Sequence, residues 1–438
     1  MRPGAVATPA PAPQQPLHGS VHDPVLGSIG FLNEVMGRYP DAISFAPGAP
    51  HPGLLDDVDP AQYTDRYLQH LVHDKGLAPD RARRLLYEYG PSRGLINGLV
   101  ADALRRDQGI DAPQEAVVIT VGAQEALLLS LRALCRGPED VLAVVSPCFV
   151  GVTGAARLLD IAVAGVEETA DGLDLDALAR LCAEVRRGGR RIRVCYVAPD
   201  FSNPGGGRMP LADRERLLEL AEIEDFLVLE DNAYGFTASP SDELPALKAL
   251  DRGRRVVHVG TFAKVCFPGA RVGYVVADQP VTTGSGTGLL ADALALLKGM
   301  VTVNTSPLAQ AVIGGMLLAH DGSLAEVGRR KGALYRDNLR RLGDGLRRHL
   351  LPDRPPGVSW NRPDGGFFVR MRLPVRVDDA LLERSAQEYG VLWTPMAPFH
   401  VGTAGDHELR LSCSYLEPDQ IDAGVRRLAA FVQEEARL

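Results

Sequence analysis

The feature that most constrains the fold is an alternation of short apolar runs with helical patterns from residue 116 onward. Stretches with helical spacing, such as 124–134 and 211–223, separate these runs of four or five largely apolar residues. Short apolar strands between helices are typical of a mostly parallel sheet covered on both faces. The sequence therefore predicts an α/β fold, with strands at 117–121, 141–145, 193–197, 226–229 and 256–259.

The chain has 438 residues, which is enough for two domains. Beyond residue 306 the pattern changes to a long helical region, broken around residues 320–323, and then to strands at 367–369 and 409–412 mixed with helices. This pattern predicts a second, smaller α+β domain. We expect a disordered tail at 1–20, an N-terminal arm and part of the small domain at 21–60, a large domain at 61–305 and a small domain at 306–438.

Composition narrows the class of protein. The net charge of -8 offers no basic surface for nucleic acid, and no apolar run is long enough to span a bilayer. The six cysteines stand singly without a CxxC motif, which indicates neither a disulfide framework nor a zinc site. The start lacks the pattern of a secretory signal. We expect a cytoplasmic protein without a metal, read the glycines at 284–288 as a flexible loop, and place His70 and His73 on a solvated surface.

Several residues that can take part in binding or catalysis directly follow the predicted strands. In parallel sheets, ligands bind at this end of the strands. Residues 122–125 open a helix after the first strand, so that free backbone amides can bind an anion. Phe149 follows the second strand and can stack on a flat ring, and Asn203 follows the third and can donate a hydrogen bond. Each also fits an ordinary role, as a turn or as a core phenylalanine.

Asp231 and Tyr234 follow the fourth strand. A buried aspartate beside a pyridine nitrogen keeps that nitrogen protonated, and Tyr234 can reach a ring hydroxyl; a helix cap is the alternative for Asp231. Arg410, on a later strand, suits either a substrate carboxylate or a structural salt bridge. The turn at Gly48 lets backbone groups approach a ligand closely.

The decisive stretch is 260–274, which follows the fifth strand. Lys264 lies among small and apolar residues, where desolvation makes its neutral, nucleophilic form accessible and allows a Schiff base with a carbonyl compound. Thr261 and Arg271 can together hold a dianionic phosphate. Lysine, hydroxyl and arginine together indicate an anchor for pyridoxal 5′-phosphate (PLP), with a buried strand ending in an exposed lysine as the alternative.

As a set, these motifs resemble those of the fold-type I, class I/II PLP-dependent aminotransferases, over nearly the whole chain after residue 25. The matching segments are YGPSRG (89–94), VGAQEA (121–126), NPGG (203–206), DNAY (231–234), FAK (262–264), PGARVG (268–273) and RLS (410–412). The resemblance implies a Schiff base at Lys264, a partner for the ring nitrogen at Asp231, and ring-oxygen contacts from Asn203 and Tyr234. It also implies phosphate contacts from Ala123, Gln124, Thr261 and Arg271, and an α-carboxylate contact from Arg410. We further expect a ring contact from Phe149 and substrate contacts from Gly48 and Asn203.

The resemblance further implies a homodimer in which Tyr89 of one subunit reaches the phosphate site of the other. Within the family, segments 23–34, 38–48, 94–97 and 151–156 are most similar to the aminoadipate-type branch. Inside that branch they are most similar to the 3,5-dihydroxyphenylglycine aminotransferases of glycopeptide-antibiotic pathways.

The sequence also departs from the family pattern. Phe149 stands where tyrosine is common, Phe201-Ser202 where Gln often precedes Asn-Pro, and Thr261 and Ala263 replace serines. These changes are compatible with PLP, and they leave the substrate and the reaction open.

We predict transamination between an aromatic, arylglycine-like amino acid and a 2-oxo acid in specialised metabolism, with Lys264 carrying the proton and Asp231 supporting the ring. Elimination, cyclisation or oxidation on the same fold is the alternative. A third hypothesis is a ligand-sensing domain of a transcription regulator. Such a regulator needs an added DNA-binding domain, so the acidic charge and a preceding tail of only about twenty residues disfavour it. Selectivity is expected from residues near Gly48, Arg93 and 395–400, with Trp393 and His400 either lining the pocket or packing.

Overall fold

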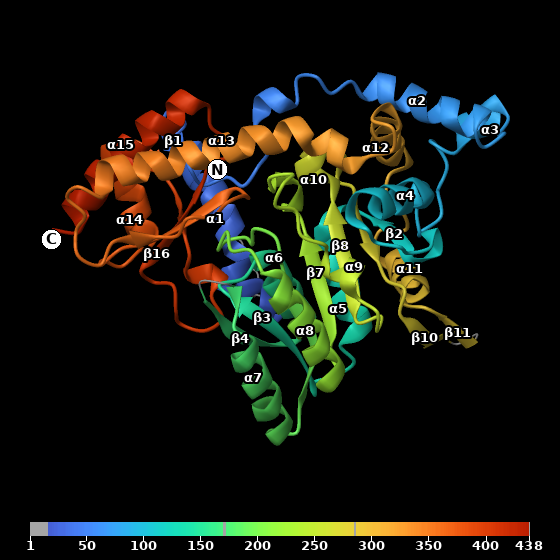
Figure 1. Cartoon of the computed structure of the whole chain (residues 1–438), viewed down its shortest axis with the longest axis horizontal. Helices are drawn as coiled ribbons and strands as arrows, with labels where there is room; N and C mark the ends of the chain where they lie inside the picture. The colour runs from blue at the N-terminus through green and yellow to red at the C-terminus, as the bar shows by residue number, and fades with distance from the viewer. Residues whose placement is uncertain (1–15, 170–171, 284–285, 438) are drawn as a thin grey trace, which may run out of the picture.

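The computed structural model describes residues 16–169, 172–283 and 286–437. Its centre is an eight-stranded sheet in the order β2-β9-β8-β7-β6-β3-β4-β5 (Figure 1). The strands are β2 (Val117–Thr120), β3 (Asp140–Ser146), β4 (Ala162–Thr169), β5 (Gly172–Leu173), β6 (Arg191–Val197), β7 (Leu227–Asn232), β8 (Val256–Thr261) and β9 (Gly273–Val276).

The sheet is mostly parallel, as predicted. Strands β4, β3, β6, β7 and β8 run parallel to one another, whereas β9 pairs antiparallel with both β8 and β2, and β5 pairs antiparallel with β4. All five predicted strands are present. Strands β4, β5 and β9 were not predicted from the sequence. β4 carries Ala, Gly and Glu with little burial, β5 has only two residues, and β9 is a buried antiparallel strand of four residues directly behind the Arg271 turn.

Helices cover both faces of this sheet. Helices α5, α6 and α11 pack on one face around Leu142 and Val257, and α7 and α8 pack on the other around Val141 and Val228. The helices of the large domain are α2 (Pro60–His73), α3 (Pro79–Arg84), α4 (Asn97–Gln108), α5 (Gly122–Leu134), α6 (Val150–Leu158), α7 (Leu175–Arg187), α8 (Leu211–Ile223), α9 (Leu247–Leu250), α10 (Phe262–Val265), α11 (Leu290–Val301) and α12 (Pro307–Ala319). Burial on both faces explains why the predicted strands are continuous apolar runs.

The long helical region beyond residue 306 is divided by a side-chain cap. Ser306 caps α12 with Pro307 at its first position, and α12 ends at Ala319. Ser323 then accepts a hydrogen bond from the backbone N–H of Glu326 and opens α13 (Leu324–Leu350). The predicted break at 320–323 is therefore confirmed.

The small domain contains a four-stranded antiparallel sheet in the order β12-β13-β16-β15, on which α13 and α15 pack. β1 pairs parallel with β14, so that the N-terminal arm joins this domain. Figure 1 shows α13 running across the top of both domains. The elements are α1 (Pro24–Arg38), β1 (Ile43–Ser44), β12 (Ser359–Trp360), β13 (Phe368–Arg372), α14 (Asp379–Arg384), β14 (Val391–Leu392), β15 (Thr394–Pro395), β16 (Glu408–Ser412) and α15 (Pro418–Glu435). The domain bounds given above remain a proposal; α12, which the prediction put in the small domain, packs with α2 and β2 in a core of the large domain.

Two expectations concern peripheral segments. The predicted disordered tail lies outside the described residues up to position 15, and a 3-10 turn forms at Gly19–His22. Residues 284–285 of the expected glycine-rich loop are also outside the described residues, but Gly286–Leu289 forms strand β11, paired with β10 (Pro280–Thr283), so the loop prediction is wrong there. Over the described ranges, no helix combines the length and hydropathy needed to cross a membrane.

Candidate active site

A cavity of about 1040 Å³ opens at the carboxyl ends of the parallel strands, against the small domain. Eleven of the twelve site residues predicted from the sequence line it: Gly48, Ala123, Gln124, Phe149, Asn203, Asp231, Tyr234, Thr261, Lys264, Arg271 and Arg410. The twelfth, Tyr89, is not among the lining residues and is 86% exposed. Segments separated by more than 360 positions therefore meet in one cavity.

Lys264 is held in the short helix α10, directly after β8. The Thr261 hydroxyl caps this helix by accepting a hydrogen bond from the backbone N–H of Ala263. The Lys264 Nζ donates to the carbonyl oxygen of Gly48 at 2.5 Å. Burial, together with the positive charges of Arg410 and Arg271, lowers the pKa of Lys264 to about 8, so a useful fraction of the amine is neutral near pH 7.

Asp231 lies at the end of β7, facing the same cavity. The Tyr196 hydroxyl, from the adjacent strand β6, donates to Asp231 Oδ2 at 2.8 Å. The other oxygen, Oδ1, is buried and has no hydrogen-bond partner among the described residues. Burial raises the pKa of Asp231 to about 6, against the opposing effect of the Tyr196 hydrogen bond. An unpartnered buried carboxylate oxygen is costly unless a ligand donates to it.

An anion cradle forms where α5 begins. Gly122 adopts a φ of 74°, and a Cβ there would lie 2.7 Å from the Arg271 guanidinium, so a glycine is required for this close approach. The free amides of the first turn, beginning at Gly122 and Ala123, belong to the same wall as Thr261. The Gln124 side chain donates to the Gly151 carbonyl at 2.7 Å, which fixes its direction.

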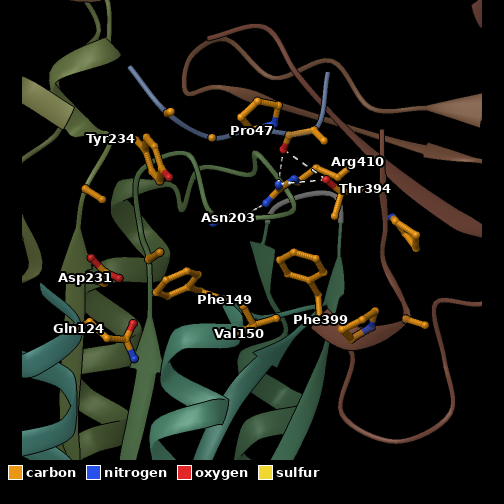
Figure 2. A pocket seen from close by; sticks show the side chains of 18 of the residues that line it. Pro47, Gln124, Phe149, Val150, Asn203, Asp231, Tyr234, Thr394, Phe399 and Arg410 are labelled. Carbon is orange, nitrogen blue, oxygen red and sulfur yellow. Dashed lines mark hydrogen bonds between the residues drawn. The ribbon is translucent and has the colours of Figure 1, made fainter. Parts of the chain in front are cut away.

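Arg410 occupies the opposite wall, with Asn203 and Thr394 (Figure 2). Its guanidinium donates to Asn203 Oδ1 at 2.7 Å, to the Ala46 carbonyl at 2.9 Å and to Thr394 Oγ1 at 3.2 Å. All three acceptors are uncharged, and the Nε remains without a partner among the described residues. Burial lowers the pKa of Arg410 to about 10, which identifies a buried cation that an anionic ligand would stabilise.

Two aromatic residues shape the floor and one side of the cavity. Phe149 directly precedes α6 and points into the cavity beside Val150 (Figure 2). The Tyr234 ring packs edge-on against Phe367 and Phe368, at centroid distances of 4.9 and 5.6 Å. Burial raises the pKa of Tyr234, so its hydroxyl keeps its proton and can donate a hydrogen bond.

The structure adds two residues that the sequence analysis missed, Tyr196 and Thr394. Each lies on a strand beside a predicted residue: β6 adjoins β7, and Thr394 is the direct cross-strand partner of Arg410. A hydroxyl at the end of the predicted strand 193–197 was the only sequence signal for Tyr196. Thr394 had none, because its two-residue strand carries no apolar pattern.

Three residues considered for selectivity do not line the cavity. Arg93 donates to the Glu115 carbonyl and to Asp292 instead. Trp393 is buried in the small-domain core, where its Nε1 donates to Ser385 Oγ at 3.0 Å. His400 pairs with Glu408 at 3.0 Å. Trp393 and His400, which the sequence left open between pocket and packing, are therefore packing residues, whereas Pro395 does line the cavity.

Comparison with known proteins identifies the family. The family model for aminotransferase class I and II matches residues 75–428. The chain belongs to this family. It is 49% identical to the (S)-3,5-dihydroxyphenylglycine transaminase of Amycolatopsis orientalis, covering 96% of this chain and 94% of that protein. It is 31% identical to the 2-aminoadipate transaminase of Thermus thermophilus, covering 89% of each. Among solved structures, the kynurenine aminotransferase of Pyrococcus horikoshii aligns with a TM-score of 0.79 at 26% identity, covering 92% of this chain and 94% of that one.

Family membership confirms the predicted fold type I and the predicted enzyme class. The protein is a PLP-dependent aminotransferase whose substrates are an amino acid and a 2-oxo acid. The cavity fits this cofactor on its own evidence. It supplies a lysine amine of lowered pKa, a buried carboxylate oxygen without a partner, and a cradle at a helix N-terminus that excludes any Cβ at Gly122.

Proposed function

We propose that this aminotransferase acts on an arylglycine and its 2-oxo acid, of the 3,5-dihydroxyphenylglycine type, in cytoplasmic biosynthesis of an antibiotic. The observation that carries the proposal is the 49% identity, over almost the full length of both chains, to a transaminase of that substrate. The other relatives, at 31% identity or less, have diverse substrates in their names, so they support only the broader activity.

The cofactor side of the cavity is assigned residue by residue. Asp231 Oδ1 would pair with the ring nitrogen, because it is the buried oxygen that lacks a partner. Asn203 and Tyr234 would donate to the ring oxygen, and Phe149 would contact the ring face. The phosphate would lie in the cradle, held by the amides of Ala123 and Gln124, the Thr261 hydroxyl and the Arg271 guanidinium.

The chemistry then needs one mobile proton carrier. When bound, PLP supplies a protonated ring that accepts the electron pair released at the substrate α-carbon. Lys264 would take the α-proton on its neutral amine and later return it, and its pKa of about 8 suits both directions. The Gly48 carbonyl, 2.5 Å from Nζ, holds that amine at the cavity wall. Asp231, kept in place by Tyr196, would hold the ring proton.

The substrate side of the cavity supports an aromatic side chain. Arg410 would bind the α-carboxylate, because its present acceptors are all uncharged. The cavity lining includes the apolar residues Met36, Val150, Pro395, Pro398 and Phe399, and Figure 2 shows Val150 and Phe399 below Arg410. Arg376, Asp378, Asp379 and Asp406 also line the cavity. An aryl ring can pack on the apolar part of this lining.

We also propose a homodimer in which Tyr89 enters the partner's site. Tyr89 is 86% exposed, and on α11 Leu296 and Met300 are 74% and 85% exposed. These residues belong to one region, because Gly90 lies beside Asn304 and Pro307, and Ser92 lies beside Gly299. Contiguous exposed apolar surface of this kind marks an interface. Light scattering should report a dimer for the native chain, and Met300→Glu should shift it toward monomer. A native monomer would contradict the proposal.

The substrate proposal is tested by anaerobic single-turnover spectroscopy of the PLP-loaded protein. Adding (S)-3,5-dihydroxyphenylglycine should bleach the band near about 420 nm and form one near about 330 nm, and its 2-oxo acid should restore the first band. L-Lysine serves as a mismatched donor. If another amino acid reacts faster than the arylglycine by a wide margin, the substrate assignment fails while the aminotransferase activity stands. Oxygen consumption or ammonia release would instead indicate a different PLP reaction.

A further inference from the structure

A buried ionic cluster joins the two domains next to the cavity. Arg370 on β13 donates from Nε and Nη2 to the two carboxylate oxygens of Glu408 on β16, at 2.9 and 2.7 Å. Its Nη1 donates to Glu168 on β4, in the other sheet, at 3.2 Å. His400 adds a contact of 3.0 Å to Glu408. The side chains of Glu168 and Glu408 are 8% and 7% exposed, so water screens these contacts little.

The pKa values of the two carboxylate groups in this cluster are shifted in opposite directions. Burial raises the pKa of Glu408, but hydrogen bonds from His400 and Arg370 outweigh it and bring the value to about 2. Burial raises the pKa of Glu168, and the opposing charge of Arg370 does not fully offset it. Arg370 is therefore the group on which the burial of both carboxylates depends.

The cluster also supports the loop that carries Asn203. Ser202 Oγ donates to Glu168 Oε1 at 3.3 Å, and Gly205 packs so closely that a Cβ there would lie 2.5 Å from the carboxylate. From the other side, Asn361 donates to the Gly205 carbonyl and accepts from the backbone N–H of Arg370 at 2.8 Å. The loop between β6 and α8 is thus tied to the small domain in two ways, by the Arg370 side chain through Glu168 and by the Arg370 backbone through Asn361.

Arg370 lies directly opposite Arg410 in the sheet. The two are cross-strand partners on β13 and β16, so both side chains leave the same face, and Glu408 shares it two residues before Arg410. Arg370 has two carboxylate partners, whereas Arg410 has only uncharged ones. The charge of Arg370 is therefore neutralised within the protein, and the charge of Arg410 is available to a ligand.

We propose that Arg370 is a positioning residue for recognition of the substrate α-carboxylate: it occupies Glu168 and Glu408, which keeps Arg410 free of internal carboxylates, and it fixes the Asn203 loop that orients Arg410. This inference rests on the proposed role of Arg410. It predicts that loss of Arg370 weakens binding of any carboxylate ligand while leaving the phosphate cradle intact, because no described residue of the cluster belongs to that cradle.

The test compares Arg370→Met with Arg372→Met in the PLP-loaded enzyme. Arg372 is a matched control on the same strand, 3.6 Å from Glu408 but 58% exposed. The amino donor is whichever of L-phenylglycine, L-tyrosine and L-glutamate the wild type converts fastest, so the test proceeds even if the arylglycine proposal fails. Phenylacetate, a carboxylate without an amine, is the competitive inhibitor.

Arg370→Met should raise the KM of the donor and the inhibition constant of phenylacetate by the same factor, about 10-fold or more. It should leave kcat within about threefold and the affinity for PLP, measured by titrating the apoenzyme, unchanged. Arg372→Met should change each value less than about twofold. The proposal would be overturned if Arg370→Met and Arg372→Met had equal KM values and equal phenylacetate inhibition constants. It would also be overturned if Arg370→Met raised the KM but left the phenylacetate inhibition constant unchanged.

If Arg370→Met does not fold, Glu168→Gln replaces it, because the amide preserves the shape and the acceptor oxygen but removes one charge. It should raise both constants by about threefold or more without weakening the affinity for PLP. No change in either constant would count against the role of the cluster. Arg410→Met distinguishes failure of the positioning role of Arg370 from failure of the carboxylate site itself. If Arg410→Met also has no effect on phenylacetate binding, the assignment of the carboxylate site to Arg410 is wrong.

Discussion

Asp231 and Arg410 are buried charged residues on opposite sides of one cavity, and they are supported in different ways. Asp231 has its partner, Tyr196, on the neighbouring strand of the same sheet. Arg410 depends on the Ala46 carbonyl, Asn203 and Thr394, which come from three distant segments. The support of Asp231 thus lies within one sheet, whereas the support of Arg410 is assembled across two domains. Cofactor binding should therefore tolerate changes at the domain boundary that carboxylate recognition does not.

The largest effect is expected at Lys264, which serves both sides. Lys264→Ala removes the amine that carries the proton, so kcat should fall by about 10⁴-fold. PLP should still bind through the cradle, and dialysis followed by absorbance would measure its retention. Transamination at the native rate would show that another group moves the proton.

The next effect tests the cofactor side alone. Asp231→Asn removes the charge that holds the ring proton, so kcat should fall by about 10²- to 10³-fold. The KM of the donor should change little, because Arg410 is untouched. Steady-state kinetics with the fastest donor would measure both kcat and KM. A change confined to KM would contradict the assignment of Asp231 to the cofactor side.

Arg410→Met tests the other side. Losing a buried charge-assisted contact to the carboxylate should lower kcat/KM by about 10²-fold, mainly through KM. PLP affinity, measured by titrating the apoenzyme, should match the wild type. A matching loss of PLP affinity would mean that the two sides are not independent.

The pH dependence of PLP uptake probes the electrostatics that the two sides share. Arg410 and Arg271 contribute to the lowered pKa of about 8 at Lys264, and only the neutral amine reacts. Covalent PLP uptake by the apoenzyme should therefore rise about 16-fold between pH 6.5 and 8 and level off above about pH 9. Stopped-flow absorbance would measure it. A rate that keeps rising toward pH 10 would indicate an unshifted lysine.

The smallest effect is expected at Phe149. Phe149→Ala removes one ring contact, which should weaken PLP affinity by about fivefold and leave the KM of the donor nearly unchanged. Titration of the apoenzyme would show it. Phe149→Leu is a control that keeps apolar bulk without the aromatic face.

The two sides also differ in how well the sequence predicts them. Asp231, Asn203 and Lys264 each follow an apolar strand of the parallel sheet, and the carboxyl ends of such strands meet at one edge. Spacing relative to the strands was therefore enough to group them. Thr394 and the Ala46 carbonyl have no comparable signal, because one lies on a two-residue strand and the other is a backbone group after β1.

The position of Tyr89 in a site cannot be predicted from one chain alone. Its motif resembles that of the family, yet the side chain is exposed and does not line the cavity of its own chain. Its place in a partner's site remains a prediction, because an exposed tyrosine acquires a ligand only through a second subunit.

By itself, the sequence determined the parallel sheet, the chemistry of its strand ends and the need for a buried lysine amine. These depend on local hydrophobic periodicity and on residues that directly follow it. Only the tertiary structure decided that Tyr196 supports Asp231, that Gly48 holds Lys264, and that Arg370 rather than Arg410 takes the buried carboxylates. The physical reason is that partner choice among buried charges depends on distance and desolvation, which arise when remote segments pack together.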